Sequence, residues 1–530
     1  MARSKRFNKK LAIVASIIAG VLFISAAISG YAFLWGNVMI EFYNEDGSLF
    51  SVQAVKPLDK VEAVHLASTE DKVFLGWFED ADDWDTYFLF GEQAWKRPWR
   101  SVKLYPKFAT PGEDVLPAEQ QALYDELVTQ FGTVPEISIT TESDPNIQKP
   151  LYAKGTLSLD CTADEFDLSN VKMEMRLRGR NSLSLPKKSY KIKFDKKNTS
   201  VFGQSGNKNW ALVANYIDIS NMRNYLAYTF ASTLSFEFSP NCYFVNLTLN
   251  GESQGLYLLV ESIEASPVRV DLQENPTAED FDTGFILEEI HFITEPNFVE
   301  NLDYIDINGH IYEIQYPKID DDDIAPENYG RIITYIKNCV SGINDVIESK
   351  DFNRFSELCD VDSFVDFMVV QELFKNLDAY AASFYFYKKP GGKLTMGPVW
   401  DFDRSVGVDI AENLYYADGI YAEYRDGLQK KTGSWFYSLW NTPEFKTLFK
   451  QRVIGLYETE MQFIINLVEP TMFYIYDSAQ ANFGIWDIET ALRGDERHTL
   501  KDLTEFGEQC GFVKYFLTAR AKWLYDYCRE

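Results

Sequence analysis

The sequence predicts an α+β fold with two lobes, a β-rich first half and a helix-rich second half. Between Glu136 and Glu289, apolar and polar residues alternate with the period of two that is typical of strands. Beyond Pro326, apolar residues recur at helical spacing in segments such as 329–349 and 361–377. The chain is 46% hydrophobic and 15% aromatic, a composition that is typical of a packed globular protein and not of a disordered one.

The N-terminal segment is expected to anchor the chain in a membrane. Residues 1–10 hold five basic residues and no acid, and residues 11–35 (LAIVASIIAGVLFISAAISGYAFLW) hold no charge. Such a run is long enough to span a bilayer as a helix, and basic flanks stay in the cytoplasm. We therefore expect a cytoplasmic segment at 1–10, a single transmembrane signal anchor at 11–35 and the bulk of the chain outside the cell. Cleavage within 24–30 (ISAAISG) is the alternative.

The chain is strongly acidic, with a formal net charge of −28. Because such a surface repels polyanions, we expect neither nucleic acid nor anionic lipid as a general partner. The six cysteines contain no C-x-x-C pair, and the four histidines show no metal-ligand spacing. The sequence therefore signals neither a disulfide framework nor a zinc site.

Residues 37–108 are expected to form a small β-rich module. The predicted strands are VMIEFY, which the turn NEDGS follows, then VFLGWF, TYFLF and SVKLYPKF. The motif F-L-G-W-F, followed by L-Y-P-K-F, resembles the Listeria–Bacteroides surface repeat. This resemblance implies a β-grasp-like fold that is suited to attachment or protein contact. Residues 109–134 are expected to form a linker and a helix, which precede a large domain at 135–528.

Two acids are expected to meet at one end of a hairpin within the large domain. Asp378 follows a predicted helix, and the two predicted strands SFYFYKK and KLTMGPVW then lead through the turn PGG to Asp401. Asp403 shares a face with Asp401 if the chain is extended. Phosphoryl transfer needs such a pair, because one carboxylate orients the acceptor hydroxyl and another holds Mg²⁺ on the nucleotide phosphates. The alternative is that Asp378 caps a turn and Asp401 merely leaves a strand.

Basic residues earlier in the chain are candidates for the opposite charge. Arg178 and Arg180 lie in RGRNS, a glycine-containing turn whose backbone N–H groups could cradle a phosphate. Lys188 has the same parity as Tyr190 and Ile192, so its ammonium group is expected on an inward face, where it needs a partner. The alternative is that these residues form plain basic surface.

Arg223 lies at the start of a predicted helix at 220–234, and Asp218 precedes it. Two interpretations of this arginine are open. It forms an internal cap and ion pair with Asp218, or it contacts phosphate.

Taken in order, RLRGRNS, PKKSYKIKF, NMRNYLA, LNGESQGLYLLVESI, GFILEE, NLDAY and GPVWDFDRSVG resemble the spore-coat CotH kinase family, over about residues 135–525. The resemblance implies an atypical two-lobed protein-kinase-like fold, use of ATP with Mg²⁺ or Mn²⁺, and phosphorylation of surface or secreted proteins on serine or threonine. It assigns Asp378 as the catalytic-loop acid and Asp401 as the metal-binding acid. The candidates for cofactor binding are Arg178, Arg180, Lys188 and Arg223.

The chain departs from the family pattern at Ser383. Many relatives carry D-x-x-x-x-N-Y-Y-x-Y, whose Asn helps to ligate metal, whereas a serine hydroxyl is a shorter and poorer ligand. Ser383 and Asp403 are therefore secondary metal-ligand candidates, and loss of a second metal site is the alternative. Two functions follow. The first is an extracytoplasmic phosphotransferase that moves the γ-phosphate of ATP to protein Ser or Thr, and the second is a catalytically weak or inactive cell-surface scaffold or adhesin.

Overall fold

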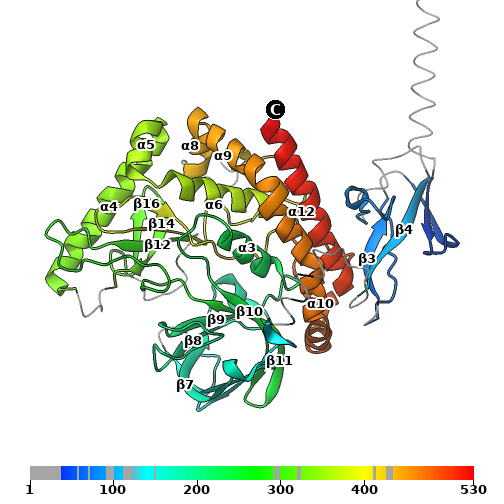
Figure 1. Ribbon diagram of the computed structural model, residues 1–530, viewed down its shortest axis with the longest axis horizontal. Helices are drawn as coiled ribbons and strands as arrows, with labels where there is room; N and C mark the ends of the chain where they lie inside the picture. Colours follow the sequence, from blue (N-terminus) through cyan, green and yellow to red (C-terminus); the bar gives the residue numbers. More distant parts are fainter. Residues whose placement is uncertain are drawn as a thin grey trace, which may run out of the picture. The chain divides into compact units, whose positions relative to one another are not determined.

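The computed structural model divides the chain into two compact units, Met1–Ala109 and Thr110–Glu530, which are described separately (Figure 1). The described residues are 37–530 except 57–58, 70–71, 91–100, most of 111–129, 149–150, 291–292, 294–298, 319–323, 410–413 and 425–433. The predicted cytoplasmic segment at 1–10 and the predicted anchor at 11–35 lie outside this part of the chain. Within it, no helix has the length and apolar character needed to cross a membrane.

The first unit contains a four-stranded sheet in the order β2-β1-β4-β3. Its strands are β1 (Val38–Tyr43), β2 (Leu49–Val55), β3 (Val73–Phe78) and β4 (Val102–Ala109). Strand β3 is buried along its whole length, and Trp77 packs edge-to-face on Phe42 at 4.9 Å between ring centroids. The predicted strand TYFLF is wrong, because this stretch follows the 3₁₀ turn Trp84–Thr86 and only Tyr87 bridges to β3. Strand β2 was not predicted.

The second unit begins with a closed seven-stranded barrel in the order β10-β11-β9-β8-β7-β6-β5. The strands are β5 (Glu136–Thr141), β6 (Ala153–Asp160), β7 (Leu168–Leu177), β8 (Tyr190–Phe194), β9 (Asn209–Val213), β10 (Cys242–Leu249) and β11 (Glu252–Glu261). Parallel pairing of β5 with β10 closes the barrel. Alternate residues such as Met175, Ile192, Leu212 and Leu259 are buried in one core, which explains the period of two in the sequence.

A second sheet has the order β13-β14-β12-β15-β16. Its strands are β12 (Phe285–Ile290), β13 (Tyr304–Ile307), β14 (His310–Tyr316), β15 (Phe384–Lys388) and β16 (Leu394–Met396). The helices of this unit are α3 (Arg223–Ser232), α4 (Pro326–Ser349), α5 (Phe352–Leu358), α6 (Val361–Phe374), α7 (Tyr421–Tyr424), α8 (Trp435–Trp440), α9 (Pro443–Leu456), α10 (Gln462–Ile485), α11 (Ile488–Gly494) and α12 (Phe506–Arg529). Helices α10 and α12 lie side by side, and α10 also packs on β11 of the barrel (Figure 1).

This architecture corrects the predicted two-lobed kinase-like fold, and the described residues contain no helix that could cross a membrane. The protein is α+β, as predicted, but its first half closes into a barrel and does not form an open sheet. The predicted change from strands to mostly helices beyond Pro326 is confirmed, since α4 begins there, but the two halves do not form separate lobes. Strand β12 from the first half pairs with β15 from the second, with Glu288 opposite Tyr385, so one sheet is built from both halves.

Candidate active site

The turn after α6 and the strand exit after β16 bring the two predicted acids to one site. Helix α6 ends at Phe374 and is capped by Lys375, whose φ of 43° is left-handed, and Asp378 lies in the turn that follows. Strands β15 and β16 pair antiparallel with Phe386 opposite Met396, and the chain then reaches Asp401. The carboxylate of Asp378 raises the pKa of Asp401, so the two side chains act on one another across the open end of this hairpin.

The electrostatics of the site are dominated by carboxylates. Burial and then the charge of Asp378 raise the pKa of Asp401 to about 6, while Arg178 and a hydrogen bond from Ser383 act in the opposite direction. Burial and then the charge of Asp401 raise the pKa of Asp403 to about 8. Five of the predicted site residues therefore share one electrostatic environment, in which a bound cation would be stabilised. They are Asp378, Asp401, Asp403, Arg178 and Ser383.

Left-handed backbone is concentrated at these residues. Asp401 has φ 67° and Ser383 has φ 52°, a conformation that costs side-chain-bearing residues about 1–3 kcal/mol each. Hydrogen bonds hold both residues there, since the Ser383 N–H donates to the Glu289 carbonyl at 2.8 Å and the Asn376 side chain donates to the Asp401 carbonyl at 3.1 Å. Such strain is typical of sites whose geometry serves function.

Helix α3 supports the segment that begins at Asp401. The Asp401 N–H donates to the Tyr228 hydroxyl at 3.3 Å, and the Phe402 N–H donates to Asn224 Oδ1 at 2.8 Å. Trp400 stacks on Tyr228 at 5.7 Å between centroids. Sequence reasoning missed these supports, although Asn224 and Tyr228 are spaced i and i+4 on one face of an apolar helix, a signal that was available.

Arg223 lies at the start of α3 and is completely buried. Its guanidinium forms an ion pair with Asp218, donates to Ser220 Oγ at 3.0 Å and donates through Nε to the Ser405 carbonyl at 3.0 Å. These contacts match the interpretation as an internal cap and ion pair. They leave the Arg223 guanidinium facing protein groups.

Lys188 is also directed elsewhere. Its Nζ donates to the carbonyls of Leu183 and Leu185 at 2.7 and 2.6 Å. The predicted inward parity was wrong because β8 begins only at Tyr190, and the alternation does not extend beyond the end of the strand. The neighbouring Lys187 is the buried lysine, with 2% of its surface exposed.

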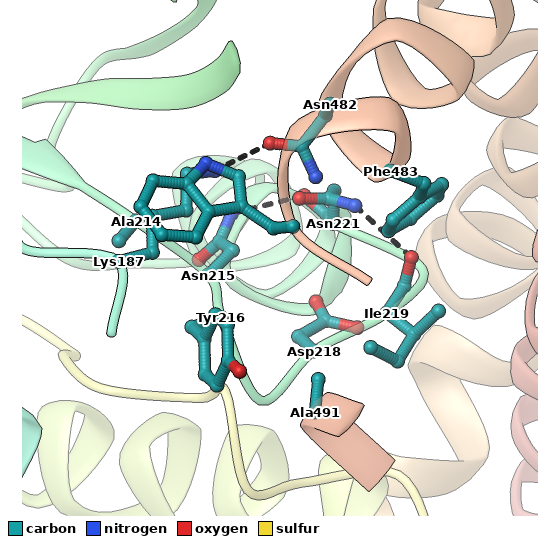
Figure 2. A pocket seen from close by; sticks show the side chains of 11 residues that line it. Lys187, Ala214, Asn215, Tyr216, Asp218, Ile219, Asn221, Asn482, Phe483 and Ala491 are labelled. Atoms are coloured by element: carbon teal, nitrogen blue, oxygen red, sulfur yellow. Dashed lines mark hydrogen bonds between the residues drawn. The ribbon is translucent and has the colours of Figure 1, made fainter. Parts of the chain in front are cut away.

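Lys187 lines a separate, small pocket between the barrel and helices α10 and α11 (Figure 2). Its Nζ donates to Asn482 Oδ1 at 2.9 Å and to the Leu256 carbonyl, and lies 4.4 Å from the centroid of the Tyr257 ring. Burial holds the pKa of Lys187 well below its ordinary value. Asp378, Asp401 and the two arginines of RGRNS are not among the residues that line this pocket.

The two arginines of RGRNS both reach the site but have different neighbours. The Arg178 guanidinium carbon lies 5.1 Å from the centroid of the Trp400 ring. Arg180 forms ion pairs with Glu288, at 3.3 Å, and with Glu313. Burial raises the pKa of Glu288, the Arg180 guanidinium opposes this rise, and the charge of Glu313 adds to it.

The donor set fits a magnesium ion that arrives with a nucleotide. Across the described residues, no group of three or more His, Cys, Asp or Glu side chains could hold a metal ion. Mg²⁺ is usually held by one or two protein carboxylates, with phosphate oxygens and water completing the octahedron. Asp401 supplies one such carboxylate and Asp403 or Asp378 a second, so the chemistry of the site suits Mg²⁺ with phosphates.

Comparison with known proteins agrees with this class of site. Residues 175–524 match the family described as CotH kinase protein, and because the match covers more than half of the chain, the chain belongs to this family. The protein is thus kinase-like by family. Inner spore coat protein H of Bacillus subtilis (strain 168) is 24% identical over 312 residues, which make up 58% of this chain and 76% of that protein.

The predicted location as a single-pass membrane protein, with the bulk of the chain outside the cell, is corrected by two findings. The relative just described is named as an inner spore coat protein. In addition, no helix of the described residues meets the requirements for crossing a membrane.

Proposed function

We propose that the protein is a phosphotransferase that moves the γ-phosphoryl group of ATP to a serine or threonine hydroxyl of a protein acceptor. The observation that carries the proposal is the pairing of Asp378 and Asp401 at the open end of the β15–β16 hairpin, where each carboxylate lies in the field of the other. Membership of the CotH kinase protein family supports it.

The proposed roles follow from position and charge. Asp378 accepts a hydrogen bond from the acceptor hydroxyl, orients it and takes up its proton as the oxygen attacks. Asp401 holds Mg²⁺, with Asp403 or the Ser383 hydroxyl as a further contact. When bound, Mg²⁺ neutralises charge on the phosphate oxygens. The support from α3 keeps the Asp401 backbone in its left-handed conformation, so the carboxylate is oriented before the nucleotide binds.

Incorporation of labelled phosphate from ATP into the protein itself and into candidate acceptors tests this proposal. We expect Asp378→Asn and Asp401→Asn to lower incorporation at least about 100-fold, the loss that follows removal of a general base or an electrostatic contact. Asp345→Asn is the matched control, because Asp345 is an exposed acid on α4. Equal incorporation by the wild type and the Asp401→Asn variant, with Mg²⁺ or Mn²⁺, would refute the catalytic roles.

A second candidate function is a non-catalytic scaffold that keeps the fold. It is favoured by Ser383, which stands where many relatives carry a metal-ligating Asn, and whose hydroxyl bonds Asp401. Titration calorimetry separates the two functions, since a scaffold of this kind binds neither Mg²⁺ nor Mg²⁺ with ATP, whereas the phosphotransferase binds the latter.

We also propose that residues 37–108 are a contact module of the Listeria–Bacteroides repeat type. Supporting this, β2 is an edge strand that exposes Leu49, Phe50 and Val52 to solvent. Exposed apolar side chains on an edge strand are suited to pairing with another protein.

A further inference from the structure

The turn between β7 and β8 carries Arg178 and Arg180, which are separated by Gly179 and whose surroundings differ. Gly179 separates them with φ 104°, in the left-handed region that favours glycine. A Cβ at this position would lie 1.9 Å from the Ser182 hydroxyl oxygen. The turn therefore has one tight conformation, in which Arg178 and Arg180 face different partners.

Arg180 is committed to the five-stranded sheet. It lies between Glu288 on β12 and Glu313 on β14, whose residues are 8% and 5% exposed. Glu288 also accepts a hydrogen bond from the Gln315 side chain at 2.8 Å. A guanidinium held between two buried carboxylates has its charge compensated by the protein, and withdrawing it would leave both acids unpaired.

Arg178 is in the opposite situation. Its backbone N–H donates to the Ser189 carbonyl at 3.0 Å, but its side chain makes no hydrogen bond or ion pair with any residue that the structure describes. The guanidinium lies over Trp400, the residue directly before Asp401. Because none of its N–H groups donates to a described residue, they are available, and they are the donors that match phosphate oxygens.

We infer that Arg178, and not Arg180, is the side chain that binds the nucleotide phosphates, with Trp400 holding its guanidinium beside Asp401. The inference rests on the proposed function, because phosphate is the ligand that this function brings to Asp401. Arg180 is a positioning residue, which ties the turn to the second sheet. The division follows from charge, since an arginine in ion pairs with two carboxylates has less to offer a phosphate than one that forms no ion pair and lies over an aromatic ring.

Titration calorimetry with two probes tests the inference on the full chain: ATP with Mg²⁺, and inorganic tripolyphosphate with Mg²⁺. Because tripolyphosphate has no nucleoside, it reports phosphate contacts alone. We expect Arg178→Gln to weaken both probes at least tenfold and by similar factors. Arg178→Lys should recover part of the loss, because it keeps the charge but not the planar donors.

Two controls make the result specific. Lys193→Gln removes one positive charge from an exposed position on β8 and should change either affinity less than twofold. Arg180→Gln should lower the melting temperature and weaken tripolyphosphate less than Arg178→Gln does, when both are measured below the melting transition. Restoring a cation with Arg180→Lys should recover both the melting temperature and the affinity, as expected for a residue that acts through the turn.

The outcomes separate this inference from the proposed function. If the wild type binds neither probe, the proposed function fails and the inference fails with it. If the wild type binds both but Arg178→Gln binds as tightly as Lys193→Gln, the proposed function stands and the inference is wrong. A larger loss of tripolyphosphate binding in Arg180→Gln than in Arg178→Gln would reverse the two roles.

Discussion

Two groups of charged residues flank Asp378 along the chain, one around Glu372 and one around Asp401, and their carboxylates are compensated to different degrees. Glu372, near the end of α6, is fully buried and accepts hydrogen bonds from Arg520 at 2.9 Å, the Tyr380 hydroxyl at 2.9 Å and the Tyr421 N–H at 2.8 Å. For Asp401, the Arg178 guanidinium and a hydrogen bond from Ser383 oppose burial and the charge of Asp378 only in part, and its pKa is raised to about 6. The comparison indicates that the cluster around Glu372 stabilises the fold, whereas the cluster around Asp401 carries negative charge that the protein does not fully compensate.

Glu372 and Arg520 form the paired cluster, and the contacts of Arg520 show that its charge is also fully compensated. Its Nε donates to the Glu372 carbonyl at 2.8 Å, and its Nη1 donates to the carbonyls of Ala417 and Gly419 at 2.9 and 2.6 Å. The guanidinium thereby ties α12 to both α6 and the segment before α7. A charge satisfied in this way has no capacity left for a ligand.

Breaking the paired cluster should have the largest effect on stability. Glu372→Gln leaves the Arg520 charge buried without its carboxylate, so we expect a loss of about 3–5 kcal/mol in the free energy of unfolding. Denaturant unfolding measures this loss. Glu444→Gln, at an exposed position on α9, is the control and should change stability by less than about 0.5 kcal/mol. A loss below about 1 kcal/mol for Glu372→Gln would show that the network is not stabilising.

Neutralising Asp401, in the less compensated cluster, should have a smaller effect on the free energy of unfolding, and one of opposite sign. Near neutral pH, Asp401 is ionised although burial and Asp378 disfavour its charge, so Asp401→Asn should stabilise the metal-free protein by about 1–3 kcal/mol. The same substitution should abolish phosphate transfer. Thermal unfolding in the presence of a chelator, compared with Asp345→Asn, measures the gain. A destabilised Asp401→Asn variant would contradict the contrast between the two clusters.

The smallest effect near neutral pH is expected from a buried histidine, and this effect grows as the pH falls. Burial, and then Arg223, lower the pKa of His498 to about 3. Below about pH 6.5 the unfolded chain takes up a proton at this position that the folded chain does not, so stability falls as pH falls from about 6.5 toward 3, by about 1.4 kcal/mol per pH unit. Stability is unaffected by this group above about pH 6.5.

The contribution of His498 is measured as a difference between two proteins. Its Nδ1 accepts from the Leu500 N–H at 3.2 Å, and its Nε2 lies 3.3 Å from the Ile217 carbonyl, an arrangement that suits the neutral ring. His498→Asn removes the titrating group, so its unfolding free energy should vary less steeply between pH 6.5 and 4.5 than that of the wild type. Other acids titrate in both proteins and cancel. Parallel pH profiles would show that folding does not lower the pKa of His498.

The candidate site could be predicted where it depends on local order in the chain. Asp378 and Asp401 lie at the two ends of one hairpin, and a hairpin of two short strands brings its own ends together. The prediction for Lys188 failed because it applied the alternation of a strand to a residue that lies before the strand begins. Lys188 was assigned from the parity of β8, but that strand starts two residues later.

The sequence offered a signal for the supporting face of α3, but it could not show which residues the supports of the site contact, because these partners lie far apart in sequence. Arg223 donates to the Ser405 carbonyl, and Arg180 pairs with Glu288 and Glu313. No periodicity reports such pairs, since each forms only after the barrel, the second sheet and α3 are packed together. The assignment of Arg223 to phosphate therefore had no means of being tested within the sequence.

By itself, the sequence determined the α+β class, the alternation of the barrel strands and the order of acid, hairpin and acid, because each depends on neighbours within about 30 residues. Only the tertiary structure decided that β5 closes the barrel on β10, that β12 joins β15, and that Arg178 is left facing Trp400 while Arg180 is paired. The reason is physical. Propensity and turn chemistry act locally, whereas strand partners and charge pairs are selected by what the whole chain can bury together.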